Sequence, residues 1–113
     1  MSFRRGHVYT GKLAAYPADR WLIVSQPILT SALAVPLRQD VSPGEMEQFT
    51  RGDLAPFAAC LVLVNETYTA VCFRITLVEE RQLADDGWDL RRPAMEAVEA
   101  GLRAALYLPE PNQ

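Results

Sequence analysis

The sequence predicts one domain of the α+β class, mainly β, in which an antiparallel sheet is followed by a C-terminal helix. The length of 113 residues suits a single domain, and residues 1–113 are assigned to it. Short apolar runs rich in β-branched residues fill the chain up to residue 80, and the one long segment with helical periodicity comes after them. Half of the residues are hydrophobic and 22% are charged, which is an ordinary globular composition.

Three strands are predicted in the first part of the chain. Residues 7–14 (HVYTGKLA) alternate in polarity, and Gly11 within them indicates a bulge or the close approach of another backbone. Residues 21–25 (WLIVS) are continuously apolar, as in a central strand covered on both faces. Residues 32–37 (ALAVPL) form the third strand, where Pro36 indicates an edge, an end or a bulge because proline cannot donate to the ladder.

A short helix is predicted near residues 43–49, after the third strand. Ser42 can cap it, Pro43 suits its first turn, and Glu45 completes a capping box.

The strongest β signal is a hairpin over residues 57–80, with its loop at residues 65–67. In that register Val64 pairs with Tyr68, and Cys60 lies opposite Cys72, close enough for their sulfurs to meet. The N-terminus lacks the apolar core of a signal peptide, so we expect a cytoplasmic protein with two buried, reduced thiols. A redox or metal role is the alternative for this pair, although two cysteines and one histidine without close ligand spacing make a poor zinc site.

The C-terminal helix is predicted over residues 93–107. Pro93 fits its first turn, and Met95, Val98, Leu102 and Leu106 recur on one stripe at helical spacing. This stripe is expected to pack on the sheet.

The charge balance limits the partners. Acidic residues outnumber basic ones by 14 to 11, whereas proteins that coat nucleic acid have a basic excess or stripe. One local phosphate site remains compatible with this balance. No run of residues reaches the length of about 18 apolar residues that a membrane helix needs, so no membrane association is predicted.

Four segments, in this order along the chain, resemble the MazF/PemK/Kid toxins: RRGHVY, DRWLIVSQ, ALAVPLRQ, and AVCFRITLVEERQL with the helix MEAVEAGLRAALYL after it. The resemblance implies a small SH3-like antiparallel barrel with a C-terminal helix, usually as a homodimer. It also implies the toxin of a toxin–antitoxin pair, neutralised by an antitoxin protein. Catalytic members of the family are endoribonucleases that cut single-stranded RNA without a metal or other cofactor.

The resemblance assigns a catalytic role to Arg20, which matches the family's arginine before the second strand. In this chemistry the 2′-hydroxyl of the RNA attacks the adjacent phosphorus, and a guanidinium can stabilise the charge that gathers on the phosphate oxygens. Arg38, Arg74 and Trp21 are the predicted substrate-binding residues. The alternative is that Arg20 and Arg38 are solvated charges at strand ends.

Several positions depart from the family pattern. Arg38 stands where the family has a threonine, Trp21 where it has a proline, and Phe73 where some members have an acidic residue. The candidate proton acceptors are His7 and Tyr9, although His7 is expected to be a structural or surface residue. A second function therefore stays open, that of a non-catalytic dimer with the same fold that acts by protein contact, as the related CcdB toxins do.

Overall fold

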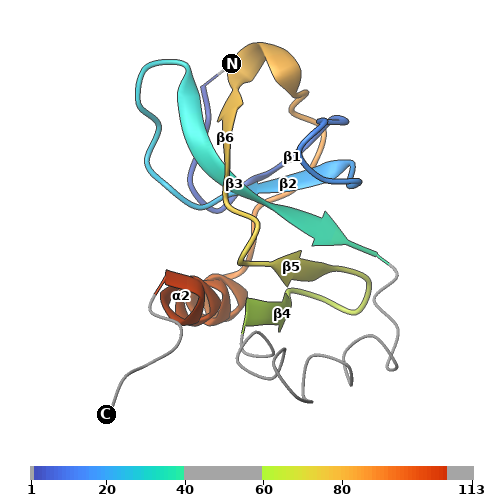
Figure 1. Cartoon of the computed structure of the whole chain (residues 1–113), viewed down its shortest axis with the longest axis vertical. Helices are drawn as coiled ribbons and strands as arrows, with labels where there is room; N and C mark the ends of the chain where they lie inside the picture. The colour runs from blue at the N-terminus through green and yellow to red at the C-terminus, as the bar shows by residue number, and fades with distance from the viewer. Residues whose placement is uncertain (1, 40–59, 107–113) are drawn as a thin grey trace.

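The computed structural model describes residues 2–39 and 60–106, in which an antiparallel sheet of six strands precedes one α-helix (Figure 1). The strands are β1 (Val8–Thr10), β2 (Arg20–Ile23), β3 (Ser31–Arg38), β4 (Leu61–Leu63), β5 (Thr69–Val71) and β6 (Thr76–Glu79), followed by the 3-10 helix η2 (Glu80–Gln82) and by α2 (Arg92–Leu106). The predicted fold class is confirmed. The short helix predicted near residues 43–49 lies outside the described residues.

β3 is the central strand, and it joins the two halves of the sheet (Figure 1). On one side it pairs with β2, and on the other its partner changes along its length. Pairing with β6 ends at Ala34 and pairing with β5 begins at Leu37. Pro36 lies in that interruption, where a missing N–H is tolerated. Of the three alternatives predicted for Pro36, the edge strand is excluded because β3 is central, and the proline lies where the ladder on one side of β3 is interrupted.

β2 is buried on both faces, as its continuous apolar sequence predicts. Leu22 belongs to one hydrophobic cluster, while Trp21 and Ile23 belong to the other, and all three side chains are fully buried. We call these clusters the helix core and the sheet core. The buried residues of the helix core are Val8, Leu22, Val35, Leu37, Cys60, Ala70, Cys72, Met95 and Val98. Those of the sheet core are Phe3, Tyr9, Trp21, Ile23, Ala32, Ala34, Val78 and Leu83.

The β4–β5 hairpin has the predicted register. Leu63 pairs with Thr69, the Val64 amide donates to the Tyr68 carbonyl, and Cys60 and Cys72 lie opposite each other. Both cysteines are free and buried, as expected, and burial together with the neighbouring Cys60 raises the pKa of Cys72 to about 12. A thiol held protonated in this way behaves as a small hydrophobic side chain.

The second strand predicted for the hairpin is divided in the structure. β5 ends at Val71, and the chain leaves the hairpin before β6 begins at Thr76 and pairs with β3. The sequence of residues 68–80 does not reveal this break, because β-branched and aromatic residues continue through it.

α2 covers the helix core, and its predicted extent agrees with the structure to within one residue at each end. Met95 and Val98 are buried, and Leu102 packs against the same core. Leu106, the last member of the predicted stripe, is 65% exposed. No helix in the described part of the chain is long and apolar enough to cross a membrane.

Candidate functional site

An open pocket of about 770 Å³ lies between the β1–β2 connection and the C-terminal end of β3. Residues 12–13 and 16–19 of the connection and residues 37–39 of β3 and its end line this pocket. These two segments lie on the same side of the molecule, at the right in Figure 1.

Gly11 fixes the start of the β1–β2 connection. Its amide donates to the Asp19 carbonyl at 3.1 Å, and its carbonyl accepts the indole N–H of Trp21 at 3.0 Å. A Cβ at this position would lie 2.7 Å from Leu83 Cδ2 and 2.8 Å from the Gln82 carbonyl oxygen, so only glycine fits. The predicted close approach of another backbone is confirmed. These contacts hold the two ends of the connection together and shape the pocket wall.

Basic side chains surround the pocket. Lys12 and Arg38 line it, and the Arg74 guanidinium lies over the ring of Tyr16, 5.6 Å from its centroid. Arg20 is adjacent, with Nη1 3.5 Å from Asp19 Oδ1. Asp19 is the one carboxylate that lines the pocket within the described ranges. Among the described residues the local charge is therefore positive, although the chain as a whole carries a net charge of −3.

The structure brings three of the four predicted site residues to this region. Arg38 lines the pocket, while Arg20 and Arg74 contact the lining residues Asp19 and Tyr16. Trp21 is different, because its side chain is fully buried in the sheet core and its N–H is bonded to Gly11. Its indole ring has no exposed face on which a ligand could stack, and its contribution to the site is to hold Gly11.

Lys12, Tyr16 and Asp19 line the pocket but were not selected from the sequence. The segment AAYPADR predicted only a turn, because Pro17 dominated its interpretation. The signal that points to these residues is their place in a connection beside Arg20, since loops held by a rigid sheet often carry binding groups.

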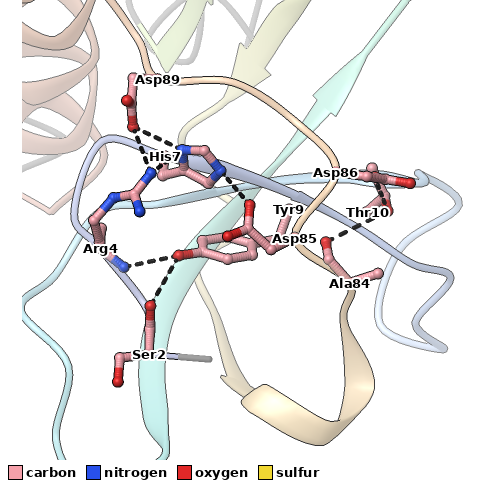
Figure 2. A network of polar contacts seen from close by, with 9 residues as sticks. All are labelled: Ser2, Arg4, His7, Tyr9, Thr10, Ala84, Asp85, Asp86 and Asp89. Carbon is pink, nitrogen blue, oxygen red and sulfur yellow. Dashed lines mark hydrogen bonds and ion pairs between the residues drawn. The ribbon is translucent and has the colours of Figure 1, made fainter.

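His7 and Tyr9, the two proton acceptors considered from the sequence, belong to a separate network (Figure 2). His7 is buried and bridges two carboxylates, with Nε2 2.6 Å from Asp85 Oδ1 and Nδ1 2.6 Å from Asp89 Oδ1. Arg4 lies on the same side, with Nη2 2.9 Å from His7 Nδ1 and 3.3 Å from Asp89 Oδ1. His7 is therefore a structural residue that ties the N-terminal segment to the connection before α2.

The Tyr9 hydroxyl also makes its hydrogen bonds within the fold. Its hydroxyl accepts the Arg4 amide at 3.0 Å and donates to the Ser2 carbonyl at 3.2 Å, and burial raises the pKa of the phenol (Figure 2). Neither Tyr9 nor His7 lines the pocket.

The neighbours of Asp89 in this network change the pKa of its carboxyl group. Hydrogen bonds from His7 and then from Arg4 hold the pKa of Asp89 below its ordinary value. Asp89 therefore keeps its negative charge across the neutral pH range.

Within residues 2–39 and 60–106, no group of three or more histidine, cysteine, aspartate or glutamate side chains could hold a metal ion.

Two of the solved structures with the same architecture are endoribonucleases. One, an endoribonuclease from a mycobacterial species, is 23% identical, and the match covers 98% of this chain and 97% of that chain with a TM-score of 0.70. This chain has their fold. A second, an endoribonuclease in complex with its cognate antitoxin from a mycobacterial species, is 22% identical over 97% of this chain and 100% of that chain, also with a TM-score of 0.70. No family model and no curated protein sequence matches the chain.

Proposed function

We propose that this protein is a toxin-type endoribonuclease of the MazF/PemK kind, which cleaves single-stranded RNA at the pocket between the β1–β2 connection and β3. The observation that carries the proposal is the positive pocket, with Lys12 and Arg38 in its wall and Arg20 and Arg74 against its lining residues. The shared fold with solved endoribonucleases supports the same assignment.

The residues at the pocket suit cleavage by the RNA's own 2′-hydroxyl. Attack of this oxygen on the adjacent phosphorus concentrates negative charge on the non-bridging phosphate oxygens, and guanidinium groups stabilise that charge with paired donors. Arg20 is the proposed catalytic residue. Arg38 replaces the neutral threonine of the family with a permanent cation, and Arg38, with Arg74, is proposed to bind the substrate backbone.

The decisive experiment incubates the purified protein with a mixed-sequence single-stranded RNA in the presence of EDTA. The wild-type protein is expected to produce fragments with 2′,3′-cyclic phosphate ends, because the 2′-hydroxyl is the attacking group, and the proposed reaction without a metal is expected to proceed in EDTA. Arg20→Ala is expected to lower the cleavage rate about 100-fold or more, the usual effect of removing one oxyanion donor, and Arg38→Ala is expected to weaken RNA binding. Arg92→Ala, at an exposed side chain on α2, removes the same charge elsewhere and is the matched control.

A non-catalytic protein of the same fold is the second candidate function. The net charge of −3 favours this function, because RNA affinity depends largely on neutralising phosphates. The replacement of the family's threonine by Arg38 favours it too. Intact RNA at a large excess of wild-type protein would remove the ribonuclease function and favour this one.

The proposed partner is an antitoxin protein. One of the solved structures with this fold is a complex with its cognate antitoxin, which supports a toxin–antitoxin pair. We further propose that the protein is a cytoplasmic homodimer, as the resemblance to the family implies.

A further inference from the structure

We infer that Asp19 accepts the proton of the attacking 2′-hydroxyl, an inference that rests on the proposed ribonuclease function. Cleavage of this kind needs a proton acceptor beside the phosphate-binding cations. Asp19 is the one carboxylate lining the pocket in the part of the chain that the structure describes, and its side chain is 61% exposed.

The other candidates from the sequence cannot take this role. His7 and Tyr9 are buried, their polar atoms are bonded within the network at the N-terminus, and neither lines the pocket. Among the described lining residues, the remaining side chains with acid–base chemistry are an ammonium and a phenol, from Lys12 and Tyr16. These group types are ordinarily protonated near neutral pH, whereas a carboxylate is ordinarily ionised and can accept a proton.

The position of Asp19 is fixed by its backbone. Its carbonyl accepts the Gly11 amide at 3.1 Å and Arg20 Nη1 at 3.2 Å, while Oδ1 lies 3.5 Å from the same Nη1. A carboxylate and a guanidinium are thus adjacent and held in place. This is the spacing that the reaction needs, because the 2′-oxygen and the phosphorus it attacks are neighbours in the substrate.

The step balances without a co-reactant other than water. Asp19 takes the proton of the 2′-hydroxyl as the bond from the 2′-oxygen to phosphorus forms and the bond from phosphorus to the 5′-oxygen breaks. The leaving 5′-oxygen takes a proton from water, and Asp19 returns its proton to solvent. The products are a 2′,3′-cyclic phosphate and a 5′-hydroxyl, and nothing is oxidised or reduced.

The test measures cleavage and binding separately for Asp19→Asn. Cleavage is expected to fall about 100-fold or more, because a general base contributes at least that factor. Affinity for the same RNA with 2′-O-methyl groups, which cannot react, is expected to stay equal or to increase a few-fold, since a negative charge leaves the pocket. Asp19→Glu keeps a carboxylate and is expected to recover part of the rate.

Glu96→Gln is the matched control, since it makes the same charge change on the exposed side of α2. Unchanged thermal unfolding of each variant verifies that it is folded. Wild-type cleavage by Asp19→Asn would overturn the inference. A parallel loss of binding and cleavage would also overturn it, because Asp19 would then only position Arg20. If the wild-type protein itself leaves RNA intact, the proposed function fails, and this inference fails with it.

Discussion

At the scale of single residues, His7 connects parts of the chain that are far apart in sequence. Its ring bonds Asp85 and Asp89, which come 78 and 82 residues later, and its edge packs against the ring of Tyr9 (Figure 2). Both ring nitrogens face carboxylate oxygens at 2.6 Å, so each side of the ring is held by one aspartate. The imidazole therefore holds the N-terminal segment in place and is not available to the pocket.

Asp89→Asn is expected to make the free energy of unfolding less dependent on pH in acid. Because the pKa of Asp89 is lower in the folded than in the unfolded protein, the carboxylate stabilises the fold above its unfolded value of about 4. That contribution is lost as the pH falls from there through the lower, folded pKa. The free energy of unfolding, measured by urea titration from about pH 6 down to about pH 2.5, should thus fall less steeply in Asp89→Asn than in the wild-type protein.

Glu79 is present in both the wild-type protein and Asp89→Asn. Hydrogen bonds from Ser31 and then Thr30 also lower its pKa, so a residual acid dependence is expected in the variant. Glu66→Gln, in the exposed β4–β5 loop, is the control and should follow the wild-type curve. Parallel curves for Asp89→Asn and the wild-type protein would contradict the prediction.

At the scale of elements, α2 completes the core on one face of the sheet. Val98 is fully buried against the helix core, and its carbonyl oxygen lies 3.9 Å from Cys72 Sγ, whereas Leu106 at the end of the same helix is 65% exposed. The helix is thus anchored along most of its length, and Leu106 at its end adds little buried surface.

Val98→Ala is expected to lower the free energy of unfolding by about 2 kcal/mol, because it removes two buried methyl groups and leaves a cavity. Leu106→Ala removes more atoms from the same helix at an exposed position and is expected to change stability by less than about 0.5 kcal/mol. Denaturant titration of both variants tests this difference. Equal losses would show that the burial of Val98 is not what anchors α2.

At the scale of the whole molecule, the described surface has an uncovered apolar region at the β2–β3 connection and on β3 and β6. Leu33 and Leu77 face each other across these two strands and are 41% and 64% exposed, and Ile28 and Leu29 are 73% and 93% exposed. Neighbouring exposed aliphatic side chains such as Leu33 and Leu77 offer apolar surface to another protein.

The proposed homodimer predicts a solution mass twice that of the single chain. Sedimentation equilibrium at micromolar concentration is the appropriate measurement, because it does not depend on molecular shape. A small chain gains buried apolar area by pairing, which is the physical reason to expect association. A mass equal to one chain at every concentration would contradict it and weaken the functional analogy with the toxins.

The sequence by itself determined the local structure. Short apolar runs and one alternating segment identified the first three strands, the three-residue loop fixed the β4–β5 register down to the pairing of Cys60 with Cys72, and helical spacing located α2. These features depend on neighbours within about ten residues, where backbone geometry alone decides which side chains share a face. The arginines at the ends of strands were likewise visible as candidates.

Only the tertiary structure decided which of these residues share a site. The change of partner along β3 at Pro36, the burial of Trp21 and the bonds of His7 to Asp85 and Asp89 depend on which distant strands lie side by side. The pairing of β1 with β2 brings Gly11 to Asp19, and Asp19 then lies at the pocket. Periodicity encodes burial, but long-range contacts follow from sheet topology, which no local pattern specifies.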